Sequence, residues 1–436
     1  MTAHESSLRS PWRWWVCLLL MLATIINYMD RLALNQLALR IKIYFDLSHQ
    51  QYSFLESAFS LAFALGAVMT GILVDRISVR WVYPIMVLGW SLAGILTGFA
   101  THFWMLLACR FALGLFEAGN WPCSIRTTRA VLPPEERSLG NSIFQSGTAL
   151  GAVITPLTVL ALLRSADPEE GFRHAVIAVT GGTYAAVSQA PADTWKYPFR
   201  VIGSLGVVWI VLWFATVPRR WLHTPQQTQL PTASPPPPFR LILADRRFWI
   251  LLVLVVAINV AWHGYRAWLP LYLQEQRNYS EVGMSQLTTA YYLVADIGAW
   301  TLGGLTLLLC RWGMPVSQAR IVALGLASIA TLATLLIPWL PEGTPLLVGL
   351  LLVAFGAMGA FPTYFALSQD LSLQHQGKVS GFLGASAHVS LALIYPLEGW
   401  IIAWTDSYES VLAVIGLAPA LAWLIVWWYW PREQRS

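Results

Sequence analysis

Long apolar stretches separated by short polar segments recur along the whole chain. A helix of about 20 apolar residues crosses the roughly 30 Å hydrocarbon layer of a bilayer, and twelve stretches have a suitable length. They lie near residues 12–35, 52–74, 81–100, 103–130, 138–163, 199–217, 248–273, 283–309, 320–340, 345–368, 379–403 and 410–430. The pattern predicts an all-α membrane protein with twelve transmembrane helices in two groups of six.

The apolar pattern is broken between the two groups, where the segment 218–247 includes four consecutive prolines at 235–238. A proline-rich tract is a semi-rigid spacer without a core of its own. We therefore predict an N-terminal six-helix bundle in residues 1–217, a cytoplasmic linker in 218–247 and a C-terminal six-helix bundle in 248–436. The polar segment 164–198 is expected to be an exposed insertion on the outer side.

The distribution of lysine and arginine predicts the orientation in the membrane. With the N-terminus inside, the inner segments hold 17 of these residues and the outer segments hold 7. Cytoplasmic loops retain positive charge, so both termini are expected in the cytoplasm. Residues 12–35 are expected to stay as the first helix, because the stretch is long for a signal peptide and contains Asp30 and Arg31.

Composition narrows the class of protein. Only 11% of residues are charged, against about 25% in soluble proteins, and 23 tryptophans are typical of membrane interfaces. These values exclude a cytosolic enzyme, a nucleic-acid-binding domain and a secreted module. The net charge of +5 is explained by Lys and Arg beside the spans, so no nucleic-acid partner is implied. The four cysteines form no CxxC pair, and no metal, cofactor or disulfide is expected.

A glycine and charged residues mark the loop after the second predicted helix. Gly71 would permit close helix packing, and Asp75 could cap a helix or pair with Arg76 or Arg80. In this position the stretch resembles the loop 2–3 motif of the major facilitator superfamily, with Ser78 where that motif has its second glycine. The resemblance implies a gating or conformational role for Gly71, Asp75, Arg76 and Arg80.

Further motifs lie at residues 27–31 (NYMDR), 110–122 (RFALGLFEAGNWP) and 138–156. Together they resemble the anion:cation symporter family, most closely its bacterial hexuronate and aldonate carriers. The resemblance implies the two-bundle facilitator fold and an inner-membrane carrier that moves a small organic anion with protons. Relatives in this family carry glutamate, sialic acid, phosphate or aromatic acids, so the substrate stays open.

Four ionisable residues lie inside predicted spans: Asp30 and Arg31 in the first, Arg110 and Glu117 in the fourth. Each costs at least about 2.5–3.5 kcal/mol to insert, and together they are neutral, so mutual pairing would make them tolerable. Helices 1 and 4 both line the cavity of the facilitator fold. Our hypothesis is that Arg31 and Arg110 hold the substrate carboxylate while Asp30 and Glu117 take protons; the alternative is a structural cluster that locks two helices together.

Other polar residues in the spans are weaker candidates. Tyr28 places a hydroxyl near the first pair, and Gln145 could hydrogen-bond sugar hydroxyls or serve as a polar helix-to-helix contact. His263 and His388 are candidate substrate contacts from the second bundle, with simple packing as the alternative. Glu56 is expected near an outer helix end, in gating or surface pairing.

Three alternatives to a symporter each require a sequence feature that can be looked for in this chain. An efflux antiporter of lipophilic compounds usually carries GxxxGPxxGG in helix 5, whereas here Gly147 and Gly151 are followed by AVITP. A membrane enzyme would need a nucleophile–base pair or metal ligands, and no such motif is found. A sensor would need a long cytoplasmic tail, but six residues follow Trp430. We predict a carrier and not an enzyme, and a monomer, because one chain contains both bundles.

Overall fold

The computed structural model describes residues 12–132, 137–166, 193–217, 240–369, 371 and 376–431. Every regular element in these ranges is a helix, which confirms the predicted all-α class. Residues 218–239 of the predicted linker lie outside the described residues. So do residues 167–192 of the predicted outer insertion.

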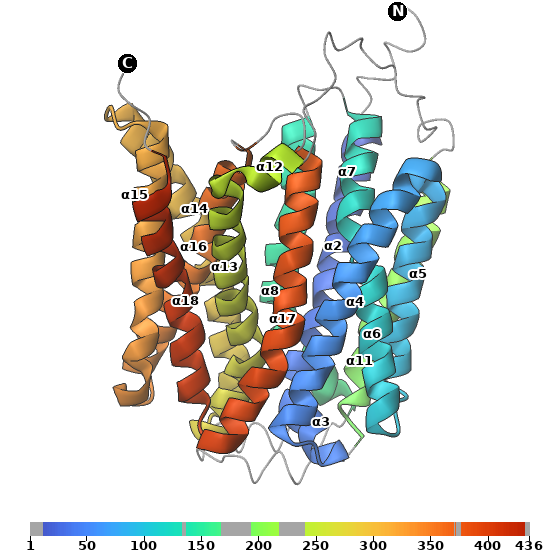
Figure 1. The fold of residues 1–436 in the computed structure, drawn as a ribbon. Coiled ribbons are helices and arrows are strands. Elements are labelled where there is room, and N and C mark those ends of the chain that lie inside the picture. The colour runs from blue at the N-terminus through green and yellow to red at the C-terminus, as the bar shows by residue number, and fades with distance from the viewer. Residues whose placement is uncertain are drawn as a thin grey trace, which may run out of the picture. The chain divides into compact units, whose positions relative to one another are not determined.

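Helices follow one another with short connections through the described chain (Figure 1). The first half contains α2 (Trp12–Gln36), α3 (Ala38–Phe45), α4 (His49–Arg76), α5 (Val79–Thr97), α6 (Phe103–Glu117), α7 (Asn120–Val131), α8 (Arg137–Ala166) and α11 (Lys196–Thr216). The second half contains α12 (Arg240–Ala244), α13 (Arg246–Leu271), the π-helical turn η3 (Tyr272–Gln276), α14 (Glu281–Arg311), α15 (Val316–Thr331), the 3₁₀ turns η4 (Leu332–Leu335) and η5 (Ile337–Trp339), α16 (Thr344–Gln369), α17 (Gln376–Thr405) and α18 (Tyr408–Tyr429).

The chain divides into two compact units. Unit 1 draws on residues 12–47, 54–217 and 280–285, and unit 2 on residues 48–53, 240–279 and 286–431, with the gaps given above. The division therefore assigns the first residues of α4 to unit 2 and the first residues of α14 to unit 1. The exact limits of the predicted bundles and linker stay predictions.

Within the described residues, eleven helices are long and apolar enough to cross a membrane. The remaining predicted span, 103–130, is divided into α6 and α7 by a turn at Ala118 and Gly119. Pro122 has no N–H to donate to the carbonyl of residue 118, which weakens a continuous helix at this point. The fourth predicted run is thus two shorter helices in series.

Large apolar side chains lie on the outside of both units. Trp104 is 71% exposed in unit 1, and Trp300 and Leu393 are 80% and 73% exposed in unit 2. Isolated exposed apolar residues occur in soluble proteins, but tryptophans on helices of this length and hydropathy are typical of surfaces that meet lipid. The chain is a multi-pass membrane protein.

Unit 1 is built on close helix contacts at small residues. Helix α2 packs along α8, and α5 packs against both α6 and α11. Figure 1 shows α5 beside α6. Helices α4 and α6 approach so closely that a Cβ on Gly66 would lie 2.1 Å from the carbonyl oxygen of Leu115. A Cβ on Gly114 would lie 2.3 Å from the carbonyl oxygen of Phe59. Such contacts bring backbones together in membrane helices, and here they place the Phe59 turn of α4 directly against α6.

Unit 2 is organised around α13. This helix packs against α18, α17 and α16, and Figure 1 shows it between α18 and α17. Its first turns contribute Phe248, Leu251 and Leu254 to an apolar core that residues of α14, α15, α16, α17 and α18 complete. The polar residues of α13, including Asn259, His263 and Arg266, follow in its later turns and are also buried.

Candidate functional site

The first part of the site is an ion pair between α2 and α6. Arg31 is 5% exposed and Glu117 is 1% exposed. The Nε of Arg31 donates to Oε2 of Glu117 at 2.9 Å, and Asn27, one turn earlier on α2, donates from Nδ2 to the carbonyl oxygen of Glu117 at 3.5 Å. The structure therefore brings together one predicted cation and one predicted acid from the first and fourth predicted spans.

Aromatic rings surround the Arg31 guanidinium. Its Cζ lies 5.1 Å from the ring centroid of Tyr28, 5.0 Å from that of Phe59 and 4.9 Å from that of Phe63. A guanidinium this close to aromatic faces is stabilised by cation–π attraction, which strengthens where water is excluded. We call Tyr28, Phe59 and Phe63 the aromatic box. It holds a positive charge in place without using a second carboxylate.

Arg110 has a different partner from the one that the sequence suggested. Its Nη2 donates to Oε1 of Glu56 at 3.2 Å, and Asn35 of α2 donates from Nδ2 to the same oxygen at 2.9 Å. The expectation of Glu56 near a helix end in surface pairing is wrong, and the gating alternative stays a prediction. Glu56 lies two turns into α4 and is fully buried, because the Arg110 guanidinium of α6 compensates its charge there.

One phenylalanine connects the two ion pairs. The Cζ of Arg110 lies 4.8 Å from the ring centroid of Phe59, and the Cζ of Arg31 lies 5.0 Å from the same centroid. Both guanidinium groups are therefore within reach of a single ring on α4. The close contact between the Phe59 backbone and Gly114, described above, holds this turn of α4 against α6 at a position between Arg110 and Glu117.

Asp30 lies on another side of α2. It is 1% exposed, and neither carboxylate oxygen accepts a hydrogen bond from any described residue. Its Oδ1 lies 2.9 Å from the position that a Cβ on Gly94 of α5 would take. The glycine leaves room for the carboxylate, so Asp30 is a buried acid packed against backbone.

The charge balance differs from that of the four residues predicted from the sequence. With Glu56 included, the buried set has two guanidinium groups and three carboxylates, so its net charge is −1 when all are ionised. A buried uncompensated charge is strongly unfavourable. One proton makes the set neutral, and Asp30 is the carboxylate whose oxygens have no hydrogen bond among the described residues.

The other predicted contacts come from helices that do not contribute to this cluster. Gln145 is an exposed residue of α8. It is two positions from Gly147, which packs against α2, and two positions on a helix are about 200° apart. In unit 2, the ring centroids of His263 on α13 and His388 on α17 are 5.8 Å apart. The roles of Gln145, His263 and His388 stay predictions.

The charged loop after α4 shows one clear difference from expectation. A Cβ on Gly71 would meet no atom of the described residues within 4 Å, so the close packing expected there is not made by this part of the chain. Helix α5 is capped by Ser78, whose hydroxyl accepts from the backbone N–H of Arg80 at 3.4 Å. The side chain of Asp75 lies outside the described residues.

The arginines of this loop differ in their surroundings. Arg76 is exposed. The guanidinium of Arg80 donates to the carbonyl oxygen of Val217, and its Cζ lies 5.4 Å from the ring centroid of Phe214. Arg80 therefore ties the start of α5 to the end of α11 within unit 1. The gating role proposed for these residues stays a prediction.

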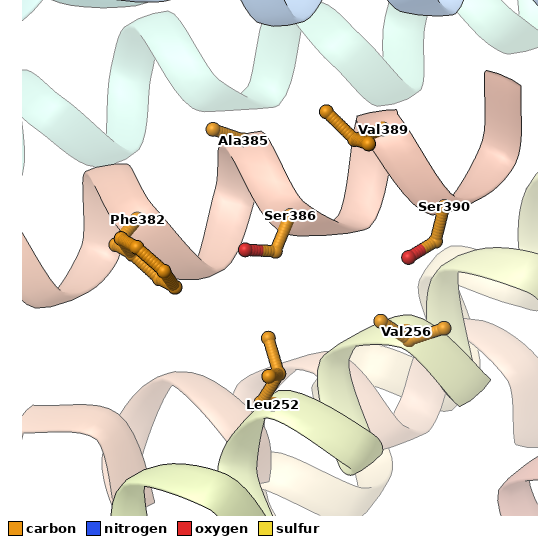
Figure 2. Close-up of a pocket in the computed structure, with 7 residues that line it drawn as sticks. All are labelled: Leu252, Val256, Phe382, Ala385, Ser386, Val389 and Ser390. Atoms are coloured by element: carbon orange, nitrogen blue, oxygen red, sulfur yellow. The ribbon is translucent and has the colours of Figure 1, made fainter. Parts of the chain in front are cut away.

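A cavity of about 340 Å³ lies between α13 and α17 in unit 2. Its lining consists of Leu252, Val256, Phe382, Ala385, Ser386, Val389 and Ser390. Figure 2 shows Ser386 and Ser390 on the side of α17 that faces α13. The lining offers two hydroxyls but no charged side chain, so it is unsuited to hold a carboxylate by itself. No group of three or more metal-ligating side chains is found among the described residues.

Comparison with known proteins decides the family. The model of the Major Facilitator Superfamily matches residues 20–374. The chain belongs to the Major Facilitator Superfamily. Membership agrees with the motif at residues 71–80 and confirms the predicted resemblance. It also identifies the chain as a membrane transporter, the general class to which its relatives belong.

The chain is similar to two transporters of known name and to one solved structure. The hexuronate transporter of Escherichia coli (strain K12) is 23% identical over 434 residues, which cover 95% of this chain and 93% of that protein. The probable L-galactonate transporter of the same strain is 26% identical, with 94% and 88% covered. The crystal structure of a bacterial homolog of the human lysosomal transporter Spinster aligns with a TM-score of 0.73 at 20% identity, covering 96% and 95% of the two chains. This last likeness shows the superfamily fold.

Proposed function

We propose that the chain is a proton-coupled symporter for a sugar acid, a hexuronate or an aldonate, that works by alternating access with both termini in the cytoplasm. The observation that carries the proposal is the buried Arg31–Glu117 pair inside the aromatic box. Relatives named as hexuronate and galactonate transporters support the substrate class. Midplane sites of this kind are typical of secondary transporters built from two bundles.

The coupling step follows from the partners of Arg31. When Glu117 takes a proton, it no longer neutralises the guanidinium, and a buried cation without a counter-ion is costly. The carboxylate of the substrate then takes the place of Glu117, through charge-assisted hydrogen bonds that a guanidinium can make in bidentate form. Proton and substrate anion enter together, so the site stays neutral through the step.

Asp30 is the second proposed proton-carrying residue in this scheme. Its carboxylate packs against Gly94 of α5 and accepts no hydrogen bond from a described residue, so we propose that it is protonated in the empty carrier. Loss of this proton would place a negative charge beside α5. A change in the packing of α2 against α5 would follow, which links protonation to helix movement.

The sugar part of the substrate needs hydroxyl partners. The Tyr28 ring is next to the guanidinium of Arg31, and we propose the Tyr28 hydroxyl as a contact for the substrate near its carboxylate. His263 and His388 are proposed as contacts from unit 2, because each imidazole can donate or accept a hydrogen bond. Gln145 is retained as a proposed contact on α8.

Counterflow in proteoliposomes tests the proposed substrate class. Vesicles preloaded with unlabelled glucuronate should take up labelled glucuronate, and uptake should be inhibited by galacturonate and galactonate at least tenfold more strongly than by phthalate or phosphate. Empty vesicles and vesicles without protein serve as controls. Inhibition by phosphate alone would replace the sugar acid with another anion, and inhibition by hydrophobic cations would favour the efflux antiporter.

A further inference from the structure

Glu56 is a buried carboxylate that the coupling scheme does not use. We infer that Glu56 is a specificity-determining residue: it occupies Arg110 with an internal carboxylate and thereby limits the carrier to anions with one acid group. The inference rests on the proposed function, since it concerns the selection among sugar acids at the same cluster. It assigns the two arginines different roles: Arg31 exchanges Glu117 for the substrate carboxylate, whereas Arg110 keeps Glu56 as its partner.

The geometry supports a stable Glu56–Arg110 pair. One oxygen of Glu56 accepts from Arg110 at 3.2 Å and from Asn35 at 2.9 Å. The two donors come from α6 and α2, so three helices of unit 1 meet at this carboxylate. A substrate that displaced Glu56 from Arg110 would also have to compensate the hydrogen bond from Asn35. Breaking a buried pair and its supporting bond is strongly unfavourable.

The short distance between the Arg31 and Arg110 guanidinium groups explains how an anion with two carboxylates could bind if Glu56 were absent. Both guanidinium groups lie about 5 Å from the Phe59 ring centroid, so they are close enough to be contacted by the two ends of one small molecule. Without Glu56, an anion with a carboxylate at each end could bind Arg31 and Arg110 together. With Glu56 in place, the second carboxylate of such an anion meets another carboxylate, and like charges at this separation repel.

The chemical class that this selects is a sugar acid with one carboxylate and hydroxyls elsewhere. Glucuronate has a single carboxylate, whereas glucarate has the same carbon chain with a carboxylate at each end. Glucuronate closes to a pyranose ring in water and glucarate cannot, so the comparison matched in shape is gluconate, an open-chain six-carbon acid with one carboxylate. Glucarate and gluconate are therefore a direct probe of Glu56, because they differ mainly in charge at one terminus.

The first test uses the unchanged protein. In glucuronate counterflow, glucarate should inhibit at least about tenfold more weakly than gluconate, a difference of ~1.4 kcal/mol. Equal inhibition by the two acids would overturn the inference while leaving the proposed function intact. Absence of glucuronate counterflow would instead overturn the proposed function.

The second test removes the charge of Glu56 but keeps its shape. Glu56→Gln retains a side-chain oxygen for Asn35 and Arg110, and it should raise the inhibition by glucarate relative to gluconate about tenfold. In Glu56→Gln combined with Arg110→Gln, this gain should be lost, because the guanidinium that receives the second carboxylate is gone. A glucarate gain that persists in the double variant, or no change of the ratio in Glu56→Gln, would contradict the inference. If a variant fails to fold, the ratio measured in the unchanged protein still decides.

Discussion

Replacing Arg31 by lysine should lower the rate of glucuronate counterflow about 10- to 150-fold, since a hydrogen bond to a charged group contributes roughly 1.5–3 kcal/mol. Lysine keeps the positive charge but not the planar fork that binds a carboxylate with two parallel hydrogen bonds. It also loses the flat contact with the aromatic box. The measurement is the initial rate of counterflow at equal amounts of reconstituted protein.

A matched variant separates this effect from general damage. Arg311 lies at the end of α14 and is exposed, so Arg311→Lys makes the same chemical change outside the cluster and should leave counterflow unchanged. Monodispersity in detergent and the midpoint of thermal unfolding should be compared for both variants. Unaltered counterflow in Arg31→Lys would show that Arg31 does not bind the substrate carboxylate through its fork.

Replacing Glu117 by glutamine should abolish acid-driven accumulation but preserve exchange. Glutamine can still accept a hydrogen bond from Arg31, so the pair of helices stays in contact, but it cannot carry a proton. For symport of one proton with one anion, each pH unit across the membrane should support roughly tenfold accumulation, because each factor of ten corresponds to about 1.4 kcal/mol. In Glu117→Gln the internal concentration should not exceed the external one.

The control for this prediction is an acid far from any proposed role. Glu342 precedes α16 in an exposed loop, and Glu342→Gln should accumulate substrate like the unchanged protein. Exchange of labelled for unlabelled substrate at equal pH is measured in the same vesicles. Accumulation by Glu117→Gln at the level of the control would exclude Glu117 as a proton carrier.

The fold class could be predicted from the sequence, because each membrane-spanning helix requires a long apolar stretch. The same reasoning located Arg31 and Glu117, since an ionised residue inside such a run needs a partner. The division between α6 and α7 was not predicted, because the apolar run alone gives no direct sign of a turn. The local signal for the break was Pro122 together with Gly119.

The pairing of Arg110 with Glu56 was not predicted, because Glu56 was expected near an outer helix end. The spacing of Glu56, Phe59 and Phe63 at i, i+3 and i+7 places them on one face, and that face could have been recognised as one that holds two guanidinium groups. The open space at Gly71 could not be foreseen, since glycine serves both close contacts and positions that touch nothing. The position of Asp30 against Gly94 depends on how α2 and α5 pack, which the pattern of either helix alone does not give.

Proton uptake on substrate binding tests the exchange at Arg31 most directly. Purified protein is titrated with glucuronate in buffers that differ in their enthalpy of ionisation, and the buffer dependence of the measured heat gives the number of protons taken up. We expect about one proton for each substrate bound by the unchanged protein and none in Glu117→Gln, because a substrate carboxylate occupies Arg31 only when Glu117 is neutral. Binding without proton uptake in the unchanged protein, or the same uptake in both proteins, would contradict the account.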